Sequence, residues 1–140
     1  MATLFTRIIS GELPGRFVWK DDRCVAFLTI APLRPGHTLV VPRAEVDHWL
    51  DLDPALAAHL MTVAQSVGRA VKDAFPCRKV GLMIAGIEVP HVHLHVTPIE
   101  SLVDMDFANQ DKHAKAADLD AAAAKLRAAL RARGHAEVAE

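Results

Sequence analysis

The chain has 140 residues, 51% of them hydrophobic, and a formal net charge of −1 at pH 7. These values are typical of one soluble domain with a single core. A near-neutral chain without a Lys/Arg run is a poor ligand for duplex nucleic acid or an anionic membrane, so we expect neither partner. The start of the chain lacks the pattern of a signal peptide, and no stretch approaches about 18 consecutive apolar residues, so we expect a cytoplasmic protein.

The first half of the chain predicts an antiparallel meander followed by one long helix. Short runs rich in β-branched and aromatic residues occupy positions 17–20, 24–30 and 37–41, and turn-forming sequences separate them. Asp53 and Pro54 are typical of a helix N-terminus. Apolar residues then recur at helical spacing up to about residue 75, namely Leu56, Leu60, Val63, Val67 and Val71.

The second half predicts two further strands and a terminal helix. Residues 79–85 and 91–97 are expected to form a hairpin through a short turn that contains Gly86 and Pro90. Beyond residue 100 the chain is polar and irregular. An alanine-rich helix follows this irregular segment and is expected to end at Gly134. Its apolar positions are Leu119, Ala122, Leu126 and Leu130. This helix is too short to be stable alone, so we expect it to dock on the domain or on a partner chain.

Three histidines alternate with apolar residues in the predicted strand 91–97. Because side chains of a strand point to alternate faces, His91, His93 and His95 share one face and the apolar residues share the other. Two imidazolium charges at this spacing would repel by about 2.5 kcal/mol. We therefore expect at most one shared positive charge on the row near pH 7, with the other rings neutral.

The residue types of this row fit more than one chemistry. A neutral imidazole can attack phosphorus while a neighbouring protonated ring assists, which is worth about 10²–10⁴ in rate. Two histidines two residues apart also hold zinc, copper or nickel, and Glu88 or His37 would then be a further ligand. The third possibility is a row of surface polar residues without a function.

The remaining histidines and the two cysteines carry no visible pattern. Cys24 and Cys77 form no CxxC pair, so we interpret them as reduced thiols without chemistry. The histidines that lie on predicted helix, loop or tail positions without a cluster are His48, His59, His113 and His135.

The stretch His91–Thr97, HVHLHVT, resembles the alternating signature of the histidine triad (HIT) superfamily, with threonine in the last apolar position. The segments LFTRIISGELP and DDRCVAFLTIAPLRPGHTLVVPR resemble the same family. The resemblance implies an α+β fold, in which a five-stranded antiparallel sheet with one long central helix and a C-terminal helix pairs into a ten-stranded dimer. It also implies a HIT domain over residues 1–100 and a C-terminal extension over 101–140.

The resemblance implies a nucleotide hydrolase or transferase that acts at the α-phosphate of a nucleoside phosphoramidate or a related conjugate. His93 corresponds to the nucleophile that forms a nucleotidyl-histidine intermediate. His91 and His95 correspond to residues that orient it and bind phosphate oxygens, and His37 corresponds to an upstream support. The resemblance implies a homodimer and no cofactor.

Substrate contacts also follow from the resemblance. Glu88 corresponds to a residue near the leaving-group oxygen, and the nucleoside pocket corresponds to Leu4, Phe5, Ile8, Phe27 and Ile30. Thr29 stands where most relatives carry an Asp that binds the ribose hydroxyls, and Ile87 replaces a loop glutamine. These departures keep open the alternative of a nucleotide-binding module with little or no turnover. The residue types of the triad keep open a further alternative, a protein that binds metal through the triad.

Some relatives bind a structural zinc through an N-terminal CxxC pair and a histidine after the third strand. In this chain Thr3, Thr6 and Glu45 occupy those positions. Hydroxyl groups are poor zinc ligands, so we expect no zinc there and assign no metal site.

Overall fold

The apolar runs of the first half form three consecutive strands, β1 (Phe17–Lys20), β2 (Cys24–Leu28) and β3 (Thr38–Pro42). The computed structural model describes residues 2–139, and in it each strand pairs antiparallel with the next, which confirms the predicted meander. β2 ends two residues earlier than predicted. The Thr29 hydroxyl accepts a hydrogen bond from the Ala31 N–H at 3.2 Å, and the chain turns there.

The second half adds β4 (Lys79–Ile84) and β5 (Leu94–Ile99), which pair antiparallel and complete a five-stranded sheet of order β1-β2-β3-β5-β4. The predicted hairpin is confirmed. Its connection spans residues 85–93, however, and is longer than the short turn expected from the sequence.

The start of the predicted strand 91–97 was wrong, because β5 begins three residues later. The Val92 N–H donates to the Val46 carbonyl at 2.7 Å instead of continuing the ladder with β4. His91 and His93 therefore lie in the segment that leads into β5. A contact with a distant loop decides this boundary, and the alternating pattern does not reveal it.

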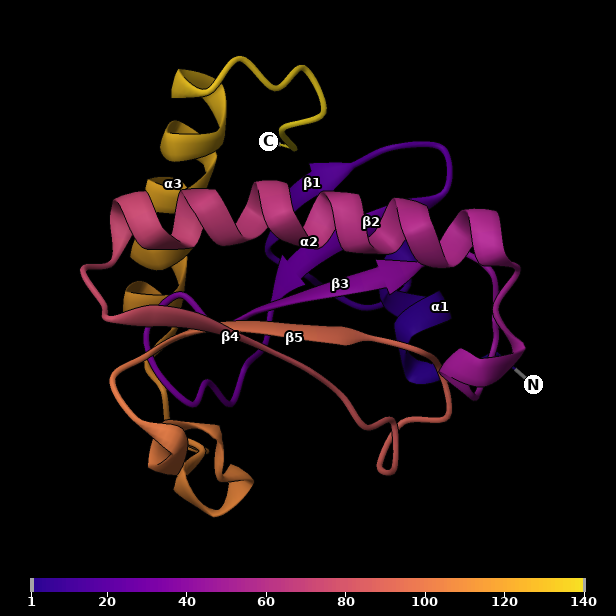
Figure 1. Ribbon diagram of the computed structural model, residues 1–140, viewed down its shortest axis with the longest axis horizontal. Coiled ribbons are helices and arrows are strands. Elements are labelled where there is room, and N and C mark those ends of the chain that lie inside the picture. The colour runs from indigo at the N-terminus through magenta and orange to yellow at the C-terminus, as the bar shows by residue number, and fades with distance from the viewer. Residues whose placement is uncertain (1, 140) are drawn as a thin grey trace.

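Helices α2 (Pro54–Ala74) and α3 (Ala116–Ala132) form as predicted and pack together over one face of the sheet (Figure 1). Most of the apolar positions predicted from helical spacing are buried in the main core, namely Leu60, Val63, Val67, Val71, Ala122, Leu126 and Leu130. α3 also contacts β1 and β2. None of the described helices is both long and apolar enough to cross a bilayer.

A short helix, α1 (Leu4–Ile9), lies on the other face of the sheet and was not predicted. Six residues are too few to show helical periodicity. Thr3 caps the helix through its hydroxyl, and Phe5 anchors it in a second apolar cluster with Phe27 and Leu39. The α+β architecture with a five-stranded antiparallel sheet is as expected.

The two edges of the sheet differ. The C-terminal segment covers β1, because the Lys20 N–H donates to the Glu137 carbonyl and the Ala139 N–H donates to the Val18 carbonyl. β4, at the opposite edge, pairs only with β5 within the described chain. Residues 1 and 140, the outer ends of the two expected segments, lie outside the described residues.

Candidate active site

Four histidines meet on the α1 face of the sheet. His95 lies on β5, His91 and His93 lie just before it, and His37 directly precedes the neighbouring strand β3. His93 and His95 are 7% and 8% exposed, whereas His37 and His91 are almost fully buried. The alternating residues Val92, Leu94 and Val96 are buried under α2, so the predicted division of faces is confirmed.

A chain of hydrogen bonds orients His95 through His37. The Leu33 backbone N–H donates to His37 Nδ1 at 3.0 Å, so neutral His37 carries its proton on Nε2. His37 Nε2 lies 2.9 Å from His95 Nδ1 and donates to it. Neutral His95 is therefore protonated on Nε2, and that N–H is available as a donor.

His93 has the opposite arrangement of donor and acceptor. Its Nδ1 lies 2.7 Å from the His91 backbone carbonyl, which can only accept, so neutral His93 is protonated on Nδ1. Nε2 of His93 carries a lone pair. Every buried side-chain nitrogen or oxygen in the described chain has a hydrogen-bond partner, so the unpartnered Nε2 atoms of His93 and His95 reach solvent. A free nucleophile and a free donor thus stand side by side, with ring centroids 4.8 Å apart.

His91 has no nitrogen left for a substrate. Its Nε2 donates to the Pro42 carbonyl and its Nδ1 accepts from the Thr3 hydroxyl, each at 2.7 Å. The ring is fully buried. In this conformation His91 orients His93 through its carbonyl, and it does not present the phosphate contact that the family resemblance implies.

His93, His95 and the supporting residue His37 are uncharged at neutral pH. Burial, with smaller effects of the neighbouring rings, lowers the pKa of His37 to about 3 and that of His95 to about 4. Burial also lowers the pKa of His93 below its usual value. These rings are therefore neutral at pH 7, mainly because they are buried, and this is compatible with the expected limit of one shared charge on the row.

Two phenylalanines pack edge-on against the reactive rings. The ring centroids of Phe5, on α1, and His93 are 4.8 Å apart, and those of Phe107 and His95 are also 4.8 Å apart. Phe107 belongs to a short 3-10 turn, Phe107–Asn109, in the segment that the sequence presents only as polar and irregular. No periodicity or motif marks this residue.

Contacts with the loop before β3 hold the segment that carries Phe107. The Gln110 side-chain amide donates to the Ala31 carbonyl at 2.9 Å, and Arg34 pairs with Asp104 at 3.2 Å. Residues beyond β5 therefore form one wall of the site.

The residues expected to contact substrate fall into two groups. Phe5 and Phe27 are buried in ring contact at 5.6 Å, and Ile8 packs against the same cluster. Leu4 and Ile30 are 45% and 74% exposed.

The two remaining expected contacts lie in loops. The Thr29 hydroxyl caps its own turn. Glu88 is exposed in the 85–93 connection, and its charge acts on His93 to oppose the lowering of that pKa.

Thr3 and Glu45 form hydrogen bonds that tie α1 to the site. The Thr3 N–H donates to Glu45 Oε1 at 2.8 Å, and the Thr3 hydroxyl donates to His91. Hydrogen bonds from Thr6 and Thr3 hold the pKa of Glu45 below its usual range. The N-terminal turn therefore supports the position of His91 directly.

Neutral imidazoles converging on one face of an antiparallel sheet define a histidine-triad protein. The HIT domain model matches residues 10–102, and the chain belongs to the HIT family. Its fold is similar to a hypothetical histidine triad nucleotide-binding protein from Sulfolobus tokodaii, with a TM-score of 0.80 and 26% identity over 91% of each chain.

Two further solved structures are similar. A Zn-bound histidine triad family protein from Mycobacterium smegmatis has a TM-score of 0.79 and 27% identity, over 95% of this chain and 96% of its own. A HIT family hydrolase from Legionella pneumophila has a TM-score of 0.61 and 26% identity, over 69% of this chain and 91% of its own.

Proposed function

We propose that the protein is a nucleotide hydrolase or transferase that acts at the α-phosphate of a nucleoside phosphoramidate or a related nucleotide conjugate. The observation that carries this proposal is the pairing of a free Nε2 lone pair on His93 with a free Nε2–H on His95, both at the surface of an otherwise buried cluster. Two similar structures are named as a nucleotide-binding protein and a hydrolase, which supports the same class.

In the proposed reaction, the lone pair of His93 Nε2 attacks the α-phosphorus, and the bond from phosphorus to the leaving amine breaks as the amine takes up a proton from solvent. The positive charge that develops on His93 is stabilised through Nδ1–H, which donates to the His91 carbonyl. The His95 Nε2–H donates to a phosphate oxygen. Water then attacks phosphorus and gives up a proton to solvent, the electron pair of the broken P–N bond returns to His93 Nε2, and a nucleoside monophosphate leaves.

The direct test compares wild type with His93→Ala on adenosine phosphoramidate, with product analysis by chromatography. We expect turnover to fall by about 10⁴-fold or more, because the nucleophile is removed, while nucleotide binding persists. His113→Ala, which changes an exposed histidine outside the site, should keep the wild-type rate. Unchanged turnover in His93→Ala would reject the proposal.

A nucleotide-binding module with little turnover is the second candidate, and the state of Thr29 favours it. Thr29 has no carboxylate to bind a sugar diol, and its hydroxyl already accepts a hydrogen bond from the Ala31 N–H within its own turn. Calorimetry with nucleoside monophosphates, followed by product analysis of conjugates, separates the two functions. Tight binding without product favours the module.

We also propose a homodimer that forms through the β4 edge. The strand has unpaired backbone groups along this edge, and Leu82 is 43% exposed. A groove of about 490 Å³ between α2 and β4 adds apolar surface, with Met61 48% exposed. Light scattering should give twice the chain mass, and Leu82→Glu should shift the protein toward the monomer. A monomeric wild type would reject the dimer.

The cytoplasmic location of the protein remains a prediction.

A further inference from the structure

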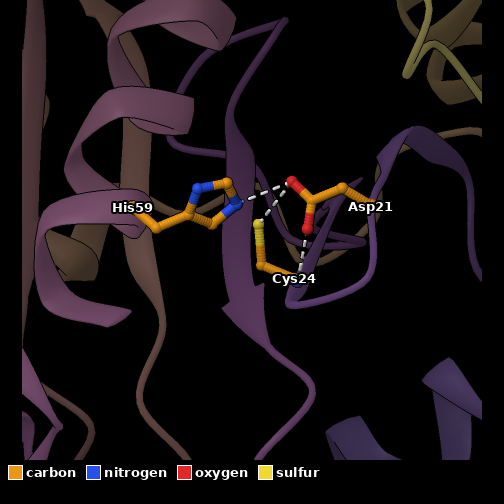
Figure 2. A group of neighbouring side chains, drawn as sticks. All are labelled: Asp21, Cys24 and His59. Atoms are coloured by element: carbon orange, nitrogen blue, oxygen red, sulfur yellow. Dashed lines mark hydrogen bonds and ion pairs between the residues drawn. The ribbon is translucent and has the colours of Figure 1, made fainter. Parts of the chain in front are cut away.

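A second cluster of reactive side chains lies at the turn between β1 and β2, on the α2 side of the sheet (Figure 2). Asp21 comes from the turn, Cys24 is the first residue of β2, and His59 comes from α2. Their ligand atoms all lie within 4.8 Å of one another. Within residues 2–139, this is the only group of three or more His, Cys, Asp or Glu side chains that meets this distance.

The hydrogen bonds of the cluster show which protons are present. The Arg23 guanidinium donates to His59 Nδ1 at 3.1 Å, so neutral His59 carries its proton on Nε2. That N–H donates to Asp21 Oδ2 at 2.8 Å, and the Cys24 thiol donates to the same oxygen at 3.5 Å. The protons of two potential metal ligands, His59 and Cys24, thus point at the same oxygen, Asp21 Oδ2.

The rest of the carboxylate is held firmly. Asp21 Oδ1 accepts the backbone N–H groups of Arg23 and Cys24, each at 2.8 Å, and the Trp19 indole N–H donates to Oδ2 at 2.9 Å. These three bonds do not depend on His59 or on the thiol. The carboxylate would keep its position if the two other protons were replaced.

We propose that this cluster is a binding site for a divalent transition-metal ion of the zinc class, with Cys24 Sγ, Asp21 Oδ2 and His59 Nε2 as ligands. A thiolate, a carboxylate and an imidazole are the donor types that zinc prefers, and three protein ligands leave a fourth position for water. The site is separate from the histidine triad and does not rest on the proposed enzymatic function.

The two separations that involve Asp21 Oδ2 are close to those of tetrahedral coordination, and Cys24 Sγ and His59 Nε2 lie within 4.8 Å of one another. At ordinary zinc bond lengths, sulfur and oxygen ligands lie about 3.6 Å apart and nitrogen and oxygen ligands about 3.3 Å apart. The observed Sγ–Oδ2 separation of 3.5 Å already matches, and the Nε2–Oδ2 separation of 2.8 Å needs to lengthen by about 0.5 Å. His59 and Asp21 side chains are 19% and 12% exposed, so an ion can enter from solvent.

The charge balance of the exchange is simple. The thiol proton leaves to solvent, and the proton of His59 moves through solvent from Nε2 to Nδ1, so the bound state holds a divalent cation, a thiolate and a carboxylate. The cluster then has no net charge, whereas the metal-free cluster has the single charge of Asp21. Arg23 must leave His59 Nδ1, which is possible because Arg23 is exposed.

Cobalt(II) substitution in tag-free protein tests the site. We expect one Co²⁺ per chain, the near-ultraviolet charge-transfer absorption of a thiolate–cobalt bond, and loss of both signals when Zn²⁺ is added. Cys24→Ser should abolish the charge-transfer band, whereas Cys77→Ser should retain it. His59→Asn should weaken binding by about tenfold or more.

The same experiment contains the outcomes that would overturn the proposal. Binding without a charge-transfer band would assign the ion to histidines alone, and a band that survives Cys24→Ser would assign it to Cys77. Absence of stoichiometric binding would also reject the site. Thermal unfolding with a chelator present checks that Cys24→Ser folds, and His59→Asn provides an independent variant if it does not.

Discussion

His93 and His59 belong to clusters on opposite sides of one sheet, and the two rings differ in which atoms are free. Nδ1 of His93 donates to the His91 backbone carbonyl, and Nε2 of His93 has no hydrogen-bond partner in the described chain. His59 has both nitrogens engaged, one with Asp21 and one with Arg23. The role that a histidine can have therefore depends on which of its ring nitrogens is already hydrogen-bonded, and residue type alone does not reveal this.

The charges of the two clusters differ as well. Burial lowers the pKa of His37, His93 and His95, so these triad rings are neutral at pH 7. Burial alone would raise the pKa of Asp21, but the hydrogen bonds it accepts outweigh burial and hold that pKa below its usual range. One cluster therefore offers a neutral nucleophile, and the other offers an anion.

Removing the free donor of the triad should have the largest effect among the following changes. His95→Ala deletes the Nε2–H that faces solvent, and we expect kcat on adenosine phosphoramidate to fall by about 10²–10³-fold, as for the loss of one donor to a developing anion. Steady-state kinetics with His113→Ala as control would measure it. A loss confined to KM would contradict the proposed donor role.

Removing the support behind that donor should have a smaller effect. His37→Leu leaves His95 Nδ1 without its donor and permits the other tautomer, so kcat should fall by about 10–100-fold. His37→Gln, which can donate a hydrogen bond, should recover part of the rate. Equal rates for the two variants would show that His37 acts only by packing.

The neutral rings should also make the folded protein sensitive to acid. The unfolded chain takes up protons near pH 6.5, but His37 and His95 in the folded state do so only near pH 3 and 4. Stability is therefore complete above pH 6.5 and is lost as the pH falls through this window. By pH 5 each ring should cost about 2 kcal/mol of unfolding free energy.

Urea titrations across this pH range would measure the loss of unfolding free energy. The His37→Gln variant has one titrating ring fewer, so between pH 7 and pH 5 it should lose about 2 kcal/mol less than wild type. An unfolding free energy that stays constant from pH 7 to pH 5 would mean that these rings titrate normally.

The smallest expected effect concerns the N-terminal turn. Thr3→Val removes the donor to His91 Nδ1, and a hydrogen bond worth about 1 kcal/mol corresponds to about a fivefold fall in kcat. Thr3→Ser should restore the rate. Thr62→Val is a matched control, because Thr62 bonds only within its own helix.

The sequence predicts well the parts that repeat with a short period. The strands and the two long helices follow from apolar spacing, and the shared face of His91, His93 and His95 follows from alternation. The start of β5 does not, because a backbone bond from Val92 to the distant Val46 decides it.

Other parts of the site depend on contacts between residues far apart in the chain. The pairing of His37 with His95 spans 58 positions, and its sequence signal is the family resemblance. Phe107 approaches His95 from a segment without periodicity, and His59 meets Asp21 across 38 positions. Such contacts follow from the tertiary fold, so residue patterns alone left His59 and Cys24 without a role.

The central claim, that His93 Nε2 is the nucleophile, is tested most directly by trapping the intermediate. Quench of wild type with an alkaline denaturant during turnover of adenosine phosphoramidate, because the P–N bond of the adduct breaks in acid, followed by peptide mass spectrometry at alkaline pH, should find one adenylyl group on His93 and none in His93→Ala. Steady turnover with no adduct and with inversion of configuration at phosphorus would contradict the claim, because water would then attack the substrate directly.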